Sequence, residues 1–233
     1  MTELHPSGAL WLPDTGTVLL ADLHFGYAWA QRRRGQLGPL VDGGAAERVM
    51  EIIGELGATR AVLLGDIVHA PKPAPEERKW IESALAAIQA RAELICVLGN
   101  HDRAFTVDFP GFTTLREWRQ PGIRALHGDV LPAGPEPGVL TVVGHFHPAL
   151  RVHNPSGVSY KWRAFLEGNG LCMLPSLSPF AAGCDMRHGM PAEVQSWFGD
   201  APVRVTLTDG RRLLPLPEPL RLSRKAGIPE RQP

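Results

Sequence analysis

The first hundred residues contain short, continuous runs of apolar side chains. Runs of this kind are typical of strands that are buried on both faces of a sheet. The first two runs are separated by a turn with Pro and Gly at residues 13–16, which predicts a strand, a turn and a strand. The four strands predicted in this half are residues 9–12, 17–20, 61–64 and 94–98.

Between these runs, apolar residues recur at helical spacing. Residues 44–56 carry them on one helical face and are followed by Gly57, a common stop signal. Residues 76–91 predict a second helix in the same way. Strands that alternate with helices imply parallel pairing through helical crossovers, so we expect an α/β fold.

The second half of the chain has shorter apolar runs, separated by segments such as the Pro- and Gly-rich residues 132–138. This pattern predicts a second, more antiparallel sheet packed on the first. We expect residues 1–220 to form a single domain and the polar residues 221–233 to form a flexible C-terminal tail. The strands predicted in this half are residues 124–126, 140–143, 150–152, 160–165, 171–174, 203–207 and 212–216.

The charge composition is balanced. The 233 residues include 24 basic and 24 acidic side chains, and 44% of the chain is hydrophobic. No overall positive field therefore attracts nucleic acid, although Arg32, Arg33 and Arg34 form a local basic cluster. Arg151, Lys161 and Arg163 are further candidates for a basic face, and solvated surface charge explains them equally well.

Cysteine usage and hydropathy point to a reducing compartment. Three cysteines without close spacing argue against a disulfide framework, and Cys96 lies in an apolar run typical of a buried thiol. No apolar run reaches the length of a membrane span, and the N-terminus shows no secretory signal. We expect a cytoplasmic protein that makes no membrane contact.

Five polar motifs each follow one of the apolar runs. At the carboxyl ends of neighbouring parallel strands, such side chains meet. Together they offer carboxylate, amide and imidazole groups but no thiolate, which suits two divalent cations better than a structural zinc cage. The motifs are Asp22-Leu23-His24, Gly65-Asp66, Gly99-Asn100-His101-Asp102, His127-Gly128-Asp129 and Gly144-His145-Phe146-His147.

In this order, the motifs resemble those of the calcineurin-like metallophosphoesterase superfamily over roughly residues 17–150. The resemblance implies a four-layer α/β/β/α sandwich of two mixed β-sheets flanked by helices. It also implies two divalent metal ions, with manganese expected and iron or zinc as alternatives. One metal would be held by Asp22, His24, Asp66 and His147, and the other by Asp66, Asn100, His127 and His145, with Asp66 bridging.

The same resemblance implies a catalytic pair. His101 would lie beside the scissile phosphate, and Asp102 would orient its ring. A hydroxide that bridges the metals would attack phosphorus, while an imidazolium with a pKa near neutrality stabilises charge or protonates the leaving oxygen. We predict substrate contacts at Arg33, His69 and Arg103, although a surface role explains Arg103 equally well.

Three passages are similar to the bacterial DNA-ligase-associated metallophosphoesterases, a family of proposed DNA damage-response endonucleases. Tyr27 departs from that family, where a Lys is expected. The similarity implies a DNA-directed phosphodiesterase or endonuclease that acts on DNA ends or single-stranded DNA, with DNA-repair proteins as partners. The passages are residues 21–26 followed by 32–35, residues 65–69 and residues 174–183.

Two other functions fit the motifs. The first is a phosphodiesterase or phosphatase that acts on small nucleotides, because the core motifs do not select a substrate. The second is a non-catalytic protein-interaction scaffold, which the intact His101 and the complete set of predicted ligands disfavour.

Overall fold

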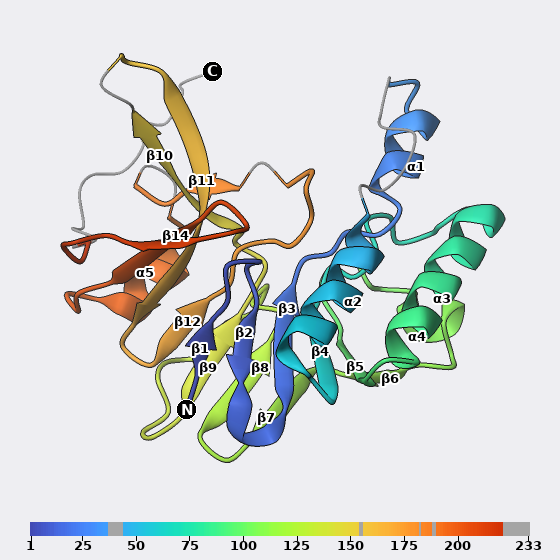
Figure 1. Ribbon diagram of the computed structural model, residues 1–233, viewed down its shortest axis with the longest axis horizontal. Helices are drawn as coiled ribbons and strands as arrows, with labels where there is room; N and C mark the ends of the chain where they lie inside the picture. Colours follow the sequence, from blue (N-terminus) through green and yellow to red (C-terminus); the bar gives the residue numbers. More distant parts are fainter. Residues whose placement is uncertain (37–43, 154–155, 182, 188–189, 221–233) are drawn as a thin grey trace.

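The computed structural model describes residues 1–36, 44–153, 156–181, 183–187 and 190–220 (Figure 1). The expected C-terminal tail, residues 221–233, lies outside this range, and the single domain over residues 1–220 stays a prediction. None of the helices in the described residues has the length and apolarity that a bilayer-crossing segment needs.

The first sheet has the strand order β1-β2-β3-β4-β5-β6 within the described residues. Its central strands β3, β4 and β5 are parallel, as the strand–helix alternation predicted. The bounds are Glu3–Leu4 for β1, Leu10–Leu12 for β2, Thr17–Ala21 for β3, Arg60–Leu64 for β4, Glu93–Val97 for β5 and Thr113–Leu115 for β6, with the 3₁₀ turn Pro13–Thr15 between β2 and β3.

The two crossover helices lie where the apolar periodicity predicted them. Helix α2, Ala45–Leu56, ends at Gly57, which adopts the left-handed conformation that favours glycine. Helix α3, Pro75–Gln89, begins with proline, and the Glu77 carboxylate accepts a hydrogen bond from the Ala74 amide at 3.0 Å. The helices that the periodicity did not predict are α1, Tyr27–Arg33, α4, Phe105–Asp108, and α5, Ala192–Phe198.

The second sheet mixes parallel and antiparallel pairs. Strand β9 pairs in parallel with β8 and β12, whereas the long strand β11 pairs antiparallel with β10, β12 and β14. The bounds are Glu117–Gln120 for β7, Ile123–Leu126 for β8, Leu140–Val143 for β9, Pro148–His153 for β10, Ser159–Gly168 for β11, Leu171–Met173 for β12, Cys184–Asp185 for β13, Arg204–Thr208 for β14 and Leu213–Pro215 for β15.

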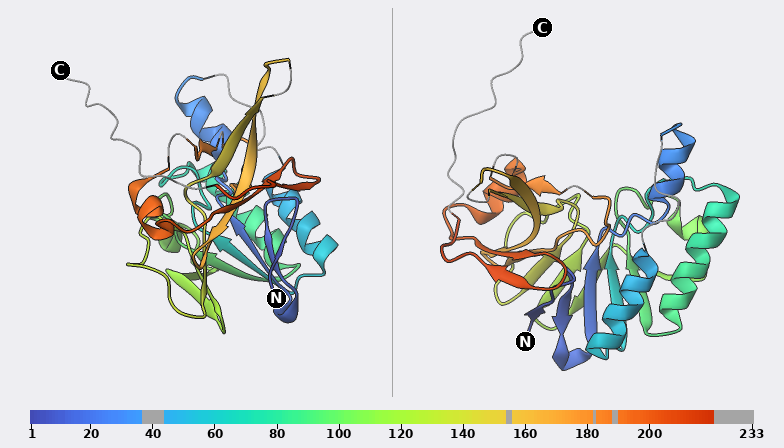
Figure 2. Two further views of the ribbon diagram at one scale, coloured as in Figure 1. Left: turned by 90° about the vertical axis from the view of Figure 1, so that its left-hand side faces the viewer. Right: turned by 45° about the horizontal axis from the view of Figure 1, so that its top comes forward.

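Three layers of buried apolar side chains hold the sheets and helices together. The middle layer joins the facing sides of the two sheets through residues such as Val62, Val97, Val142 and Phe165. A second layer packs α2 and α3 on the outer face of the first sheet, and a third packs α5 on the outer face of the second. The views in Figures 1 and 2 agree with this order. The chain therefore forms the expected α/β/β/α arrangement of two mixed sheets flanked by helices.

Candidate metal centre

The five polar motifs lie at the carboxyl ends of strands from both sheets. Asp22 follows β3, Asp66 follows β4, and His127 directly follows β8. Backbone hydrogen bonds join these turns across strands: the His24 amide donates to Asp66 O at 2.9 Å, and the Gly144 amide donates to His127 O at 2.9 Å. Because the strands are parallel, their ends meet at one edge, and seven predicted ligands gather there.

Most of these residues have an unusual backbone. Within the described residues, six residues other than glycine have a positive φ, and five of them are predicted ligands, with φ between 45° and 64°. This left-handed region costs an ordinary residue roughly 1–3 kcal/mol, and such residues concentrate at functional sites. The five are Asp22, His24, Asp66, His145 and His147.

One cluster of potential metal ligands consists of Asp22, His24 and His147, whose donor atoms lie within 4.8 Å of one another. The Nε2 atoms of His24 and His147 are 3.4 Å apart, and His147 Nε2 lies 3.5 Å from Asp22 Oδ1. The Asp22 carboxylate is fully buried and accepts hydrogen bonds from the His145 amide at 3.0 and 3.1 Å. The backbone thus fixes this carboxylate beside two imidazoles.

A second cluster consists of Asp66, His127 and His145. His127 Nε2 lies 3.0 Å from His145 Nδ1 and 3.1 Å from the side-chain oxygen of Asn100. Asp66 lies between the two clusters, because its Oδ1 is 3.3 Å from His127 Nε2 and its Oδ2 is 4.0 Å from His24 Nε2. This is the position required of a bridging carboxylate.

The side chains present fit two divalent cations. His127 Nδ1 lies 3.1 Å from Leu64 O, so Nδ1 carries the proton, and the lone pair on Nε2 faces the cluster. Burial, together with the nearby histidines, lowers the pKa of His24 to about 3, although Asp22 opposes this, so its imidazole is neutral as a ligand must be. Imidazole nitrogens that face one another at 3.0 and 3.4 Å need a cation or a proton between them.

The pKa of His147, in the cluster with Asp22 and His24, is shifted as well. Burial lowers its pKa, but the hydrogen bond and charge of Asp22 outweigh burial, and the net shift is upward. Mixed nitrogen and oxygen donors of this kind accept manganese, iron or zinc.

His101 and Asp102 occupy different places in the centre. His101 Nδ1 lies 2.7 Å from His69 O, so the carbonyl of His69 holds the ring, with Nε2 3.9 Å from Asp66 Oδ2. The Asp102 carboxylate instead accepts hydrogen bonds from the amides of Gly99, Ile67 and Val68 at 2.9, 3.3 and 3.0 Å. Among the described residues, the contact that orients the His101 ring therefore comes from His69. Burial raises the pKa of Asp102 to about 6, even with three amide donors.

The chain matches the model of the calcineurin-like phosphoesterase family over residues 17–164. It belongs to this family. The phosphoesterase is thus a metal-dependent hydrolase of phosphate esters, and the expected superfamily is confirmed.

Comparisons with other proteins add to this result. The crystal structure of the nuclease MPE from Pseudomonas putida is similar, with a TM-score of 0.64 and 20% identity over 92% of this chain and 94% of that chain. A protein of unknown function from Aquifex aeolicus aligns with 17% identity over 60% of this chain and 81% of that chain, with a TM-score of 0.32. Among proteins with curated descriptions, none matches this sequence.

A hollow of about 540 Å³ adjoins the metal centre of the phosphoesterase. It brings together two of the three predicted substrate residues, Arg33 and His69, with His101. The Arg33 guanidinium forms an ion pair with the buried Glu77, which offsets its charge. Arg103 is absent from this lining, and its Nε donates to Asn100 O at 3.3 Å.

An aromatic stack contacts His69, which the sequence did not predict. Tyr27 stacks on Phe180 with a ring separation of 4.8 Å and an interplanar angle of 10°. Tyr27 also contacts His69, with the ring centroids 4.8 Å apart and an interplanar angle of 63°. Tyr27 and Phe180 are 153 positions apart in the sequence, so only the fold reveals the stack.

Proposed function

We propose that this phosphoesterase is a two-metal phosphodiesterase that cleaves DNA, with single-stranded DNA or DNA ends as its substrate. The observation that carries the proposal is the arrangement around Asp66. Its two carboxylate oxygens face separate ligand clusters, and the Nε2 atom of His101 lies 3.9 Å from one of them.

Two divalent cations bound there would polarise the phosphoryl oxygens and supply an activated water. The protein positions the other reactive group. Because the His69 carbonyl can only accept a hydrogen bond, it holds the proton on His101 Nδ1. His101 Nε2 then faces the centre, and when the ring is protonated, Nε2–H donates to the phosphate or the leaving oxygen.

The arrangement of elements supports a chain-like substrate. Helix α1 and the β10–β11 hairpin project on opposite sides of the edge where β3 and β4 end (Figure 1). Helix α1 ends with Arg32 and Arg33 and is followed by Arg34, and the hairpin carries Arg151, Lys161 and Arg163. Basic side chains on both sides of a metal centre suit a phosphate backbone.

The fold similarity to the Pseudomonas putida nuclease MPE extends over nearly the full length of both chains, which supports a nuclease. Manganese as the metal and a role in DNA repair with repair proteins as partners rest on the three family-like passages, and the cytoplasmic location rests on the cysteine usage and hydropathy of the sequence.

An activity panel tests the proposed function. Metal-free protein is supplied with Mn²⁺, Fe²⁺ or Zn²⁺ and assayed with single-stranded DNA, duplex DNA, a small diester reporter and a monoester reporter. We expect Mn²⁺-dependent cleavage of single-stranded DNA and of the diester. The His101→Ala variant should lose about 10²–10⁴-fold in rate, and the exposed His153→Ala variant should match wild type. Diester turnover without any cleavage of DNA would remove DNA as the substrate.

The second candidate is a small-molecule nucleotide phosphodiesterase or phosphatase. Two observations favour it: the zero net charge of the chain and the ligand-sized hollow beside His101. A panel of nucleotides and cyclic nucleotides in the same assay distinguishes the two candidates. Fast turnover of one nucleotide with intact DNA supports this second function.

A further inference from the structure

We propose that a second hollow, built around Arg48 and Arg163, binds a backbone phosphate of the nucleic-acid strand whose scissile phosphate lies at the metals. The inference rests on the proposed DNA-cleaving function. The hollow has a volume of about 370 Å³ and is separate from the one beside His101. Its lining includes Arg48, Ala149, Lys161 and Arg163.

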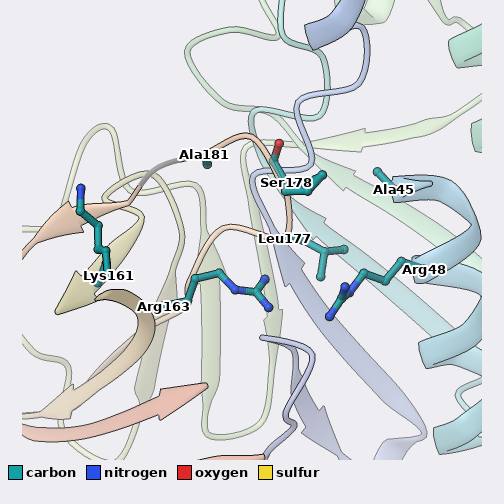
Figure 3. A pocket seen from close by; sticks show the side chains of 9 residues that line it. Ala45, Arg48, Lys161, Arg163, Leu177, Ser178 and Ala181 are labelled. Atoms are coloured by element: carbon teal, nitrogen blue, oxygen red, sulfur yellow. The ribbon is translucent and has the colours of Figure 1, made fainter. Parts of the chain in front are cut away.

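The two arginines reach the hollow from opposite halves of the fold. Arg48 extends from α2 and Arg163 from β11, and their guanidinium groups point toward each other (Figure 3). Both approach Gly210. A Cβ at that position would lie 2.8 Å from Arg48 Nη2 and 3.3 Å from Arg163 Nη2. The missing side chain at Gly210 therefore leaves room for both cations within reach of one anion.

Their positive charge is not neutralised within the described part of the chain. There, neither Arg48 nor Arg163 has a carboxylate within 4 Å, and the one side-chain hydrogen bond recorded for the pair runs from Arg163 Nη1 to Ser176 O at 3.1 Å. Burial lowers the pKa of Arg163, Arg48 lowers it further, and Asp209 opposes both. Two like charges brought together in a hollow are unfavourable until an anion joins them.

A phosphate is the anion that this geometry suits. Guanidinium groups bind phosphate oxygens through paired, charge-assisted hydrogen bonds, and two of them can grip one phosphate from two sides. Lys161 lines the same hollow, two residues before Arg163 on the same face of β11. Arg151 pairs with Lys161 across the β10–β11 hairpin, so positive charge continues along that face.

The hollow is next to the metal centre. One wall is formed by Leu177, Ser178, Pro179 and Ala181. These residues belong to a segment that binds the carbonyl of Asp22 through the Ser176 hydroxyl at 2.8 Å and the Ser178 amide at 3.2 Å. Ala149, on another wall, is two residues from His147. A strand that crosses this short segment would place one phosphate at the metals and another between the arginines.

Binding measurements without catalysis test the inference. Fluorescence anisotropy of a labelled single-stranded oligonucleotide in EDTA gives Kd as a function of salt for wild type, Arg48→Gln and Arg91→Gln. Arg91 is an exposed arginine two residues after the end of α3 and serves as the matched control. We expect Arg48→Gln to weaken binding about tenfold at low salt. It should also reduce the slope of log K against log salt by about 0.7, the value of one phosphate contact on a single strand. Arg91→Gln should bind as wild type does.

Turnover of the small diester reporter separates this inference from the proposed function. A reporter too short to reach the arginines should be hydrolysed equally by wild type and Arg48→Gln. If Arg48→Gln binds DNA like wild type while the reporter is still cleaved, the phosphate site is wrong and the phosphodiesterase stands. If no diester is cleaved by wild type, the proposed function fails instead.

A thermal-shift series with inorganic phosphate distinguishes the two sources of a phosphate group. Stabilisation of wild type but not of Arg48→Gln by free phosphate, with equal DNA affinity of the two proteins, would assign the hollow to a small anion and overturn the strand-binding inference. The Arg48→Glu variant gives a second check, because its carboxylate would occupy the hollow and pair with Arg163. It should bind DNA more weakly than Arg48→Gln.

Discussion

Asp22, His24 and Asp66 adopt left-handed backbone conformations that only a well-packed surrounding can maintain. Part of that surrounding is the space left by glycines of the motifs. A Cβ at Gly144 would lie 2.7 Å from Asp22 Oδ2, and one at Gly65 would lie 2.3 Å from His127 Nδ1. Glycine is therefore needed at these positions because ligand side chains occupy the space of a Cβ.

Replacement of Gly144 by alanine should disturb the metal centre through Asp22. We expect Gly144→Ala to weaken metal binding about 10- to 100-fold, as changes next to ligands generally do, measured as the Mn²⁺ concentration that gives half-maximal diester cleavage. Gly54→Ala is the control, because Gly54 is helical and a Cβ there meets no atom within 4 Å. That variant should keep wild-type metal dependence and gain about 0.5–1 kcal/mol in unfolding free energy. Equal metal dependence of both variants would contradict this account of Gly144.

Cys96 and Cys172 should be chemically inert in the folded protein. Both side chains are fully buried, and burial raises the pKa of both thiols, so neither offers a thiolate to a reagent. With Ellman's reagent at pH 8, we expect these two thiols to react only after unfolding in guanidinium chloride. Rapid release of three equivalents from native protein would show that the core opens. Their inertness also agrees with the expectation of a reduced core thiol at Cys96.

At the scale of elements, the loops after β4 and β5 are joined by one carboxylate. Asp102 accepts hydrogen bonds from Ile67, Val68 and Gly99. In Asp102→Asn, an amide group would face one of these donors and leave it unsatisfied, which costs about 1–3 kcal/mol. Urea unfolding should show this loss. The Asp108→Asn control, which removes an ion pair to Arg78 at the surface, should lose less than about 1 kcal/mol. Equal stability of the two variants would mean that Asp102 does not hold the loops.

The elements that could be predicted are those with strong local patterns. The sequence predicts β3, β4 and β5 from their continuous apolar runs, and α2 and α3 from their amphipathic periodicity. These five elements form the parallel half of the fold. Helices α1 and α5 are seven residues each, shorter than the window in which helical periodicity can be read. Tyr27 stacks on Phe180, and Arg48 and Arg163 line one hollow, only because tertiary packing brings them together. No local pattern predicts either arrangement.

The candidate site also has features that the sequence predicts and features that it does not. The motifs predicted which residues gather, because strand ends in a parallel sheet converge. Contacts that depend on backbone conformation were not predictable, including the left-handed φ of the ligands and the hydrogen bond from His101 to the carbonyl of His69. The role in orienting the His101 ring that the resemblance implied for Asp102 shows what sequence adjacency cannot predict. A carboxylate next to a histidine in sequence need not bind its ring, and here it binds backbone amides.

At the scale of the whole molecule, the metal centre connects the two sheets. Asp22, His24, Asp66 and Asn100 follow strands of the first sheet, whereas His127, His145 and His147 follow strands of the second. Imidazole nitrogens of the second half lie 3.3–3.5 Å from carboxylate oxygens and an imidazole nitrogen of the first half. Cations bound between the clusters would therefore bind the folded state alone and stabilise the packing of one sheet on the other.

Metal binding should accordingly raise the melting temperature. A site filled at 100 times its Kd contributes about 2.7 kcal/mol, and in a chain of this size each kcal/mol raises Tm by about 2–4 °C, so Mn²⁺ should raise Tm by at least about 5 °C over protein in EDTA. Differential scanning fluorimetry across a Mn²⁺ titration measures this shift. His145→Ala, which removes a ligand from the second sheet, should show a smaller shift, and His153→Ala should show the full one. Because unfolding separates the sheets and scatters the ligands, a Tm independent of Mn²⁺ in wild type would mean that the clusters do not hold cations in the folded protein.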